Sequence, residues 1–432
     1  MDSAQLAQLD HRHVWHPFTQ QQGWSEETPL MIERGEGVYL FDTEGRRYLD
    51  GTASLWCNVH GHRHPAIDRA IHEQVDRISH STMLGLSHPG ATELAGRLVE
   101  IAPPGLDRVF YSDSGATAAE IALKIAFQYQ QQRGESGRTS FVRLRDAYHG
   151  DTIGSVSVGG IDLFHATYRP LLFETHAAEP GDAGDMERVL AEHAGEVAAV
   201  IVEPLVQGAA AMIVHPPGYL RAVRELCNAH GLLLICDEVA TGFGRTGTMF
   251  ACEQEDVAPD LLCMAKGISG GYLPLAATLT TEEIYAGFLG APAEARTFFH
   301  GHTYTGNPLA CAAALASLDI FEQERTIERM QPKLRLLAEL LAGIEAMPEV
   351  AEVRWRGFLI GIDLGEHDPN LRLGHRVTLA ARERGAIVRP LGDTIAIVPP
   401  LSISEEQLRE LMAITAESIE AAVASLSTAT RA

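Results

Sequence analysis

The sequence is poor in basic side chains and contains no long apolar run. Its 34 lysines and arginines stand against 57 aspartates and glutamates, which gives a net charge of −23. This negative balance disfavours nucleic acid and anionic membranes as partners. No window of about eighteen apolar residues predicts a membrane span. The N-terminal residues are polar and lack the apolar core of a secretory signal, so we expect a cytoplasmic protein.

Cysteine is scarce, and no two cysteines have the CxxC spacing. Several of them sit in apolar runs, so reduced thiols in the core are expected, in keeping with a cytoplasmic location. The histidine-rich segment 60–64 is broken by glycine and lacks the acid or thiol partners of a closed metal site. We therefore expect no metal ion. The cysteines are Cys57, Cys227, Cys236, Cys252, Cys263 and Cys311.

Length and composition indicate more than one structural unit. A chain of 432 residues with 46% hydrophobic side chains exceeds an ordinary domain and can bury a large core. Between about Phe110 and Ala276, apolar runs of strand length alternate with helical patterns. This alternation predicts an α/β fold with a mostly parallel sheet and helices on both faces. Segments 350–364 and 386–398 then predict strands of a smaller α+β unit, with a helix at 373–384 between them.

One stretch combines a buried strand with two carboxylates. Residues 232–236 form an apolar run that is followed directly by Asp237 and Glu238. In open α/β sheets, ligands bind at the carboxyl ends of the strands. A second apolar run, 261–265, leads to Lys266. A lysine and an acid at neighbouring strand ends suit pyridoxal phosphate, which needs a covalent lysine partner and a carboxylate beside its ring nitrogen. Taken singly, each residue also fits a helix cap or a solvated side chain.

The stretch as a whole resembles the signature of the class III (ω-type) aminotransferases. It contains the acid pair, the Gly-rich turn 242–247, the segment 260–262 and a lysine followed by small residues. The resemblance covers nearly the whole chain and implies pyridoxal-phosphate fold type I. It also implies three parts: residues 1–60 as an arm and part of a small domain, 61–330 as the large cofactor domain, and 331–432 as the C-terminal small domain.

A predicted strand-to-helix turn favours an anion site. Strand 108–112 is followed by the small polar turn 113–117 and an Ala-rich helix. This arrangement points free backbone N–H groups and the positive end of a helix dipole at an anion. The resemblance assigns Gly115 and Ala116 of the turn to the phosphate of the cofactor.

The other cofactor contacts are implied by the resemblance. Lys266 is expected to hold the cofactor and to move protons, and Asp237 to keep the ring nitrogen protonated. Tyr148 is expected to stack on the ring, with Val239 on its other face. Lys266, Asp237 and Tyr148 are therefore the expected catalytic residues.

Segment 298–308 is rich in glycine, histidine and threonine and has neither a helical nor a strand period. In the resembled fold, a loop from the second subunit completes each active site. Thr303 resembles the residue that binds the phosphate across that interface, and Gly301 and His302 lie beside it. The resemblance therefore implies a homodimer with shared active sites.

Residues 15–20 (WHPFTQ) predict an ordered, non-helical arm because they combine a proline with aromatic side chains. The same segment resembles the 7,8-diaminopelargonic acid synthases, the branch of the family that acts in biotin synthesis. In that branch an aromatic residue, here Phe18, lies over the substrate. Arg389, which precedes a proline, matches the arginine that binds the substrate carboxylate. The further residues expected at the substrate are Leu55, Trp56, Asp151, Arg245 and Gly301.

The resemblance implies an aminotransferase that converts 8-amino-7-oxononanoate to 7,8-diaminononanoate by a ping-pong mechanism. The expected amino donor is S-adenosylmethionine. L-Lysine is the alternative, because Leu55–Trp56 offers one tryptophan where many users of S-adenosylmethionine have two. A broad ω-amine:pyruvate or diamine aminotransferase is a second alternative, against which segment 15–20 and Arg389 argue. A binding protein without activity is the third, and the presence of both Lys266 and Asp237 argues against it.

Overall fold

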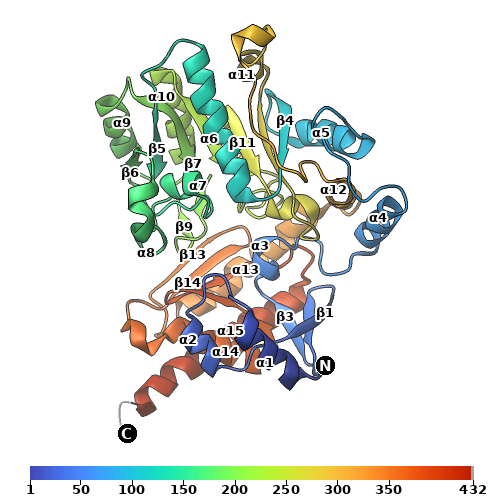
Figure 1. The fold of residues 1–432 in the computed structure, drawn as a ribbon. Coiled ribbons are helices and arrows are strands. Elements are labelled where there is room, and N and C mark those ends of the chain that lie inside the picture. Colours follow the sequence, from blue (N-terminus) through green and yellow to red (C-terminus); the bar gives the residue numbers. More distant parts are fainter. Residues whose placement is uncertain (430–432) are drawn as a thin grey trace.

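The computed structural model describes residues 1–429, with side chains described through residue 426. At its centre is a seven-stranded sheet with the order β4-β12-β11-β10-β7-β5-β6 (Figure 1). Strand β12 runs antiparallel to β11 and β4, and the other neighbouring pairs are parallel. The predicted, mostly parallel sheet is therefore confirmed. Its strands are β4 (Leu106–Ser112), β5 (Ser140–Leu144), β6 (Thr175–Ala178), β7 (Val197–Val202), β10 (Leu233–Asp237), β11 (Leu261–Met264) and β12 (Ala276–Thr281).

Successive side chains of the central strands point into two different cores, as strand geometry requires. In β10, Leu233 and Ile235 join the core that helix α6 (Gly115–Gln132) covers. Leu234 and Cys236 join the core on the opposite face. All four side chains are buried. Burial on both faces explains why this strand is a continuous apolar run in the sequence.

Helices cover both faces of the sheet, as predicted (Figure 1). Helix α6 packs against β11 and β12 on one face. Helices α5, α9, α10 and α12 contribute their buried side chains to the core of the other face. The helices of this part, besides α6, are α4 (Pro65–Val75), α5 (Pro89–Ile101), α7 (Ile153–Ser157), α8 (Asp162–His165), α9 (Ala183–Glu192), α10 (Tyr219–His230), α11 (Glu282–Ala286) and α12 (Pro308–Gln323).

Two four-stranded sheets lie in the lower half of Figure 1, with the orders β1-β2-β3-β15 and β13-β14-β17-β16. Strand β15 (Ala386–Ile387) pairs in parallel with β3 (Arg47–Asp50), so the N-terminal and C-terminal parts share one sheet. Strands β2 and β3 pair in antiparallel order and form a hairpin. The domain boundaries at residues 60 and 330 stay a prediction.

The remaining elements complete this lower part and form the two-stranded sheet β8-β9. Residues 14–20 lie without helical structure between α1 and α2, as predicted. The elements are α1 (Ser3–His13), α2 (Gln21–Glu26), β1 (Ile32–Glu36), β2 (Tyr39–Asp42), β8 (Val206–Gln207), β9 (Ile213–Val214), α13 (Thr326–Glu345), β13 (Glu352–Arg356), β14 (Leu359–Asp363), α14 (Leu373–Glu383), β16 (Arg389–Leu391), β17 (Thr394–Ile397) and α15 (Glu405–Ala429).

A short left-handed turn, α3 (Ala53–Trp56), leads from β3 towards the large sheet. All of its residues have positive φ, from 44° to 79°, which costs energy for side chains that carry a Cβ. The buried carboxylate of Asp50 offsets this cost. It accepts hydrogen bonds from the N–H and hydroxyl groups of Thr52 and Ser54, and it faces Nε2 of His62 at 2.9 Å.

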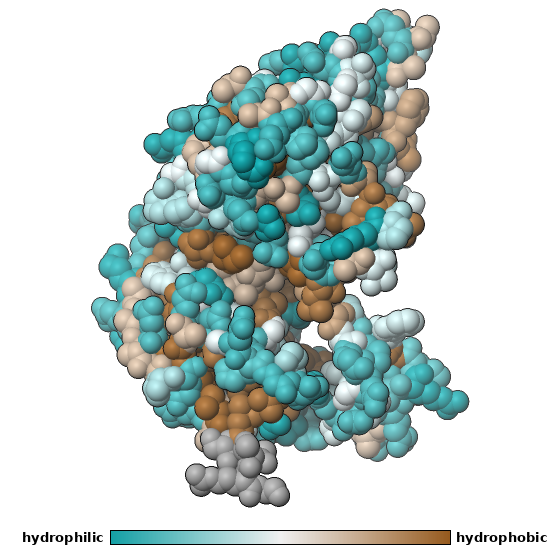
Figure 2. Space-filling model, turned by 90° about the vertical axis from the view of Figure 1, so that its left-hand side faces the viewer, coloured by the Kyte–Doolittle hydropathy of each residue, from teal (hydrophilic) through white to brown (hydrophobic). Residues whose placement is uncertain are grey.

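Hydrophobic residues gather around a hollow at mid-height in Figure 2, between the part that holds the large sheet and the part that holds the small sheets. All six cysteines are free thiols and five of them are buried, as predicted. Among the described helices, none combines the length and the apolar character that crossing a membrane requires.

Candidate active site

A cavity of about 840 Å³ opens between the large sheet and the turn α3. Its floor lies where two neighbouring strands end, because Asp237 is the last residue of β10 and Lys266 follows β11. The N-terminus of α6 and the loop after β5 contribute to its walls. Nine residues singled out from the sequence line this one cavity: Leu55, Trp56, Gly115, Ala116, Tyr148, Asp151, Asp237, Val239 and Lys266.

The carboxylate of Asp237 is held by two donors. Its Oδ1 accepts a hydrogen bond from the N–H of Val239 at 3.0 Å, and its Oδ2 accepts one from Nδ1 of His149 at 2.6 Å. His149 is buried, and its Nε2 has no partner among the described residues. The sequence analysis missed His149. Its one signal was its position directly after Tyr148, which gave no reason to pair it with β10.

Lys266 lies on the cavity floor, with Nζ 4.6 Å from the centroid of the Trp56 ring. Burial lowers the pKa of its amine, and the carboxylates of Asp237 and Glu203 partly offset this effect. The backbone φ of Lys266 is +45°, a costly value that persists only where the surrounding structure enforces it. A lysine with reduced proton affinity suits a nucleophile or a general base near neutral pH.

The N-terminus of α6 offers unpaired donors to the cavity. Ser114 caps the helix by accepting a hydrogen bond from the N–H of Thr117. The N–H groups of Gly115 and Ala116 have no partner within the described chain, and both residues line the cavity. A Cβ on Gly115 would lie 2.6 Å from Cγ1 of Val239, so this close packing requires glycine. Free N–H groups and the helix dipole make this end an anion-binding site.

These groups fit pyridoxal phosphate. The phosphate requires an anion site, the ring nitrogen an acid, and the aldehyde an amine, and the cavity contains all three. Its volume of about 840 Å³ also leaves room for a substrate beside the cofactor, since ligand pockets typically span about 300–1,000 Å³.

Tyr148 is fixed by two acids. Its hydroxyl donates to Oδ2 of Asp151 at 2.7 Å, and its backbone N–H donates to Oε1 of Glu203 at 3.0 Å. Glu203 also accepts a hydrogen bond from the N–H of Gly208, at 3.0 Å, so it orients the chain beneath Trp56 as well. Burial raises the pKa of Glu203 to about 7. Its role as an orienting residue follows from these contacts.

Phe18 and Arg389 lie near Tyr148 without lining the cavity. The rings of Phe18 and Tyr148 meet edge-on, with centroids 6.5 Å apart. Arg389, at the start of β16, is partly buried, and burial lowers the pKa of its guanidinium. This guanidinium makes no hydrogen bond or ion pair with any residue that the structure describes. It is therefore available to an anionic ligand.

Arg245 lies behind the cavity wall rather than in it. The side chain is buried, at 1% exposure, and it donates to the backbone carbonyls of Pro399, Trp56 and Asn58. Its two Nη atoms therefore face backbone carbonyls, and the side chain is not part of the described lining of the cavity. Arg245 holds the segment that carries Trp56, and a direct contact with substrate stays a prediction without geometric support.

The predicted partner loop does not line the cavity of its own chain, since Gly301, His302 and Thr303 are absent from the described lining. Nδ1 of His302 lies 3.0 Å from the carboxylate of Asp113, which lines the cavity and precedes the cap of α6. Phe299, on the same loop, is 80% exposed. Within a single chain, these three residues therefore do not contribute to the described wall of the cavity.

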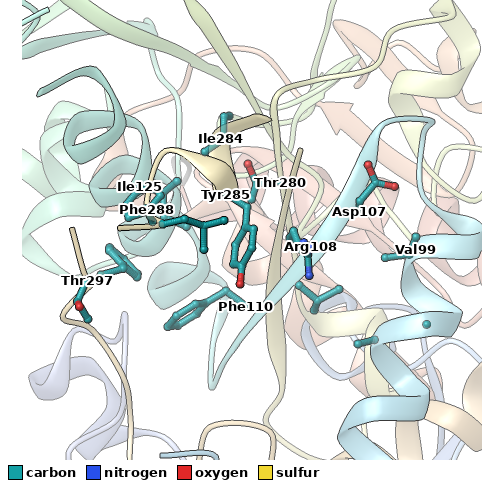
Figure 3. Close-up of a pocket in the computed structure, with 15 residues that line it drawn as sticks. Val99, Asp107, Arg108, Phe110, Ile125, Thr280, Ile284, Tyr285, Phe288 and Thr297 are labelled. Atoms are coloured by element: carbon teal, nitrogen blue, oxygen red, sulfur yellow. The ribbon is translucent and has the colours of Figure 1, made fainter. Parts of the chain in front are cut away.

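A second cavity, of about 730 Å³, lies between α5, β4 and α11 (Figure 3). Apolar side chains such as Phe110, Ile284 and Phe288 form much of its wall. Arg108 at its edge is paired with Glu282. Because its described lining includes neither a lysine nor a histidine, this cavity lacks the groups that cofactor chemistry needs.

Known proteins resemble this chain over almost its whole length. The family described as aminotransferase class-III matches residues 21–419. A relative from Nitratidesulfovibrio vulgaris, named adenosylmethionine-8-amino-7-oxononanoate aminotransferase, is 56% identical over 95% of this chain and 80% of its own. The crystal structure of the enzyme of that name from Methanocaldococcus jannaschii has a TM-score of 0.96 and 46% identity, over 97% of this chain and 99% of its own. An amine transaminase from an uncultivated Pseudomonas species, solved in a PLP-bound form, has a TM-score of 0.88 and 37% identity, over 95% of this chain and 98% of its own.

Proposed function

The chain belongs to the class III aminotransferases, and on that premise we propose that it converts 8-amino-7-oxononanoate to 7,8-diaminononanoate with S-adenosylmethionine as amino donor. One observation carries the proposal. Lys266, Asp237 and the unpaired N–H groups at the start of α6 converge on a single cavity. The near full-length match to relatives that carry this enzyme name supports the same reaction here.

Pyridoxal 5′-phosphate, when bound, would supply a carbonyl carbon that carries the amino group from donor to acceptor and a ring that accepts electrons from the substrate. The N–H groups of Gly115 and Ala116 bind its phosphate. Asp237 keeps the ring nitrogen protonated, because an opposite charge nearby favours the cationic form. The hydrogen bond from His149 holds this carboxylate in one orientation. Tyr148 and Val239, which both line the cavity, would hold the two faces of the ring.

Lys266 attaches the cofactor and then moves the proton that each half-reaction requires. Burial lowers the pKa of its amine, so the neutral form of Nζ is more populated near neutral pH than in an exposed lysine. Neutral Nζ would accept a proton from the substrate carbon that bears the amino group, and protonated Nζ would return a proton in the opposite half-reaction. The ring of Trp56, 4.6 Å away, keeps water from one side of this atom.

The amino acceptor, 8-amino-7-oxononanoate, is recognised at its carboxylate. This substrate has a carboxylate at one end of its chain and a ketone near the other. When the ketone lies at Lys266, the carboxylate needs a cation at some distance from that lysine. The unpaired guanidinium of Arg389 meets this need, because a planar guanidinium can bind a carboxylate with two hydrogen bonds. Phe18 covers the aliphatic chain beside Tyr148.

The relatives and the residues near the cavity favour different amino donors. Relatives are named for S-adenosylmethionine, whereas the single tryptophan in Leu55–Trp56 weakens stacking with adenine and keeps L-lysine as an alternative. We test this by mixing the cofactor-loaded enzyme with each donor alone and following the cofactor absorbance in a single turnover. A spectral change with L-lysine and none with S-adenosylmethionine would reject the proposed donor.

A broad amine transaminase is the second candidate, because an amine transaminase is among the similar solved structures. The two functions differ in their acceptor. We expect 8-amino-7-oxononanoate to be aminated far faster than pyruvate, with the product identified by mass spectrometry. Faster turnover of pyruvate would favour the second candidate.

A homodimer with shared active sites completes the proposal. The large side chains Leu84, Leu86, Phe299 and Tyr304 are exposed. Their two segments touch, since Nε2 of His88 lies 2.6 Å from the carbonyl oxygen of Gly306. An exposed apolar patch next to a loop without a role in its own chain supports its use by a second copy. Thr303 of this loop then binds the phosphate in the partner's cavity.

A further inference from the structure

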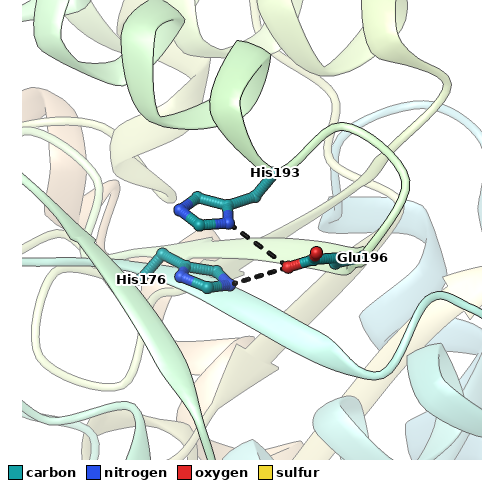
Figure 4. A group of neighbouring side chains, drawn as sticks. All are labelled: His176, His193 and Glu196. Carbon is teal, nitrogen blue, oxygen red and sulfur yellow. Dashed lines mark hydrogen bonds and ion pairs between the residues drawn. The ribbon is translucent and has the colours of Figure 1, made fainter.

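A cluster of two histidines and a glutamate lies at the edge of the large sheet (Figure 4). His176 is in β6, the outermost strand, and His193 caps the C-terminus of α9. Glu196 lies in the turn that leads to β7. The two imidazole rings are stacked, with 3.6 Å between centroids and 12° between planes. None of the three side chains lines the active-site cavity, so the proposed aminotransferase chemistry does not use them.

The three donor atoms lie within 4.8 Å of one another, which is near the range that one ion can bridge. Oε2 of Glu196 lies 3.3 Å from Nδ1 of His193 and 4.0 Å from Nε2 of His176. An ion with bonds of about 2.0–2.1 Å holds tetrahedral ligand atoms about 3.3–3.4 Å apart. One of the two oxygen–nitrogen separations already matches. For both imidazole nitrogens to face one ion, the rings must turn out of their stacked arrangement, and the exposure of the His193 and Glu196 side chains (31% and 62%) permits this movement.

The backbone around the cluster is held in place before any ion binds. His176 sits in the parallel ladder opposite Val142 of β5. The N–H of Glu196 bonds to the carbonyl of His193, which closes a tight turn. The carbonyl of Glu196 in turn accepts hydrogen bonds from the backbone and the hydroxyl of Ser140. Ligands on fixed backbone lose little freedom when they bind an ion.

Nε2 of His176 has a polar neighbour in the cluster, since it lies 3.1 Å from the hydroxyl oxygen of Ser140. A bound ion would replace this contact as the partner of Nε2.

We propose that His176, His193 and Glu196 bind a late first-row divalent metal ion, with Zn²⁺ as the representative, and that the ion fastens β6 to the connection between α9 and β7. Two imidazole nitrogens and one carboxylate oxygen are the donors that Zn²⁺ accepts, and the fourth position is left to water. Mg²⁺ and Ca²⁺ prefer oxygen donors throughout. The expectation of no metal came from segment 60–64, and the spacing of these three residues has no motif that the sequence could reveal.

The test uses the untagged, cofactor-loaded enzyme after treatment with a chelator. Calorimetric titration with ZnCl₂ and with MgCl₂ measures the number of ions bound per chain and their affinity. The variants are His193→Gln and Glu196→Gln, both at solvent-accessible positions. His72→Gln, at an exposed histidine of α4, is the matched control. Thermal unfolding with and without ZnCl₂ reports whether the ion fastens the strand.

We expect the wild type and His72→Gln to bind one more Zn²⁺ per chain than His193→Gln, and Glu196→Gln to bind that ion at least tenfold more weakly. Zn²⁺ should raise the melting temperature of the wild type but not of His193→Gln. Crystals soaked in ZnCl₂ should show an anomalous peak between the three side chains. Equal Zn²⁺ binding by the wild type and His193→Gln, or equal binding of Mg²⁺ and Zn²⁺, would overturn the site. Binding without a rise in melting temperature would overturn its fastening role.

Discussion

At the scale of single residues, Lys266 combines a lowered pKa with a strained backbone at the end of a buried strand. We predict that Lys266→Ala folds but loses turnover, because no other described amine lines the cavity. The chain has only three lysines, at 124, 266 and 333, so reductive trapping of the cofactor followed by peptide mass spectrometry gives an unambiguous attachment site. Lys124→Ala, at an exposed lysine, is the control. Label on Lys333, or steady-state activity in Lys266→Ala, would contradict the assignment.

Arg389 is predicted to bind the amino acceptor and not the amino donor. Arg389→Ala removes a charge-assisted hydrogen bond worth roughly 1.5–3 kcal/mol, so KM for 8-amino-7-oxononanoate should rise about ten- to hundredfold. The donor half-reaction should change much less. Arg384→Ala changes an exposed arginine nearby and should leave both half-reactions unaltered. Equal losses in both half-reactions of Arg389→Ala would argue against this division of roles.

At the scale of elements, the left-handed turn α3 depends on Asp50. Replacing this carboxylate by the amide of asparagine turns an acceptor oxygen into a donor that faces the donors of Thr52, Ser54 and His62. Asp50→Asn should therefore destabilise the protein by about 1–3 kcal/mol. It should also raise KM for both substrates, because Leu55 and Trp56 of the turn line the cavity.

Ser54→Ala is the graded comparison for the turn, since it removes one of the hydroxyl donors and leaves the carboxylate in place. We expect a smaller loss of stability and a smaller rise in KM than for Asp50→Asn, both measured by thermal unfolding and steady-state kinetics. An Asp50→Asn protein with normal stability and normal KM values would show that the turn does not need this anchor.

The segment after α3 docks on α12 through His60 and makes stability depend on pH. His60 bonds to the hydroxyl of Ser317 at 2.9 Å, and burial, followed by the charge of His64, lowers its pKa to about 3 from 6.5. The unfolded chain takes up this proton as the pH falls below about 6.5, whereas the folded chain stays neutral to about pH 3. Stability therefore falls with decreasing pH across this window.

His60→Gln should flatten that dependence by up to about 1.4 kcal/mol per pH unit. Unfolding measured between pH 4 and 6.5 checks this expectation. His72→Gln changes an exposed histidine and should keep the wild-type slope. A wild-type slope in His60→Gln would assign the pH dependence to other groups.

At the scale of the whole molecule, shared active sites predict complementation between two inactive chains. Lys266→Ala lacks the amine, and Thr303→Glu should repel the phosphate in the partner's cavity. Each variant alone should be inactive as a homodimer. A mixed dimer would regain one complete site, with the amine from one chain and Thr303 from the other. Co-expression with two different tags, followed by tandem purification, isolates that mixed dimer for assay.

Activity near half of the wild-type value per dimer is the expected result. Two copies of the Lys266→Ala chain with different tags, purified in the same way, provide the control for background. No recovery in the mixed dimer, or a monomeric wild type by light scattering, would contradict shared sites.

The sequence alone determined the order of strands and helices and the two residues at the floor of the site. Burial of the large sheet on both faces makes its strands read as apolar runs, and these runs depend only on local order in the chain. Because parallel strands end at the same edge of a sheet, Asp237 and Lys266 could be expected side by side. Their neighbouring strands, with Asp237 opposite Cys263, agree with this expectation.

Only the tertiary structure decided which distant side chains support that floor. His149 reaches Asp237 across 88 positions of sequence, and Arg245 reaches Pro399 across 154. Such contacts depend on how helices and loops pack over the sheet. The local sequence around each residue does not predict which distant residue it contacts. The same reasoning explains why the sequence put Arg245 at the substrate, whereas packing buried it against backbone carbonyls. Unsatisfied carbonyls in the interior are costly, so the buried guanidinium stabilises the fold through its hydrogen bonds to them.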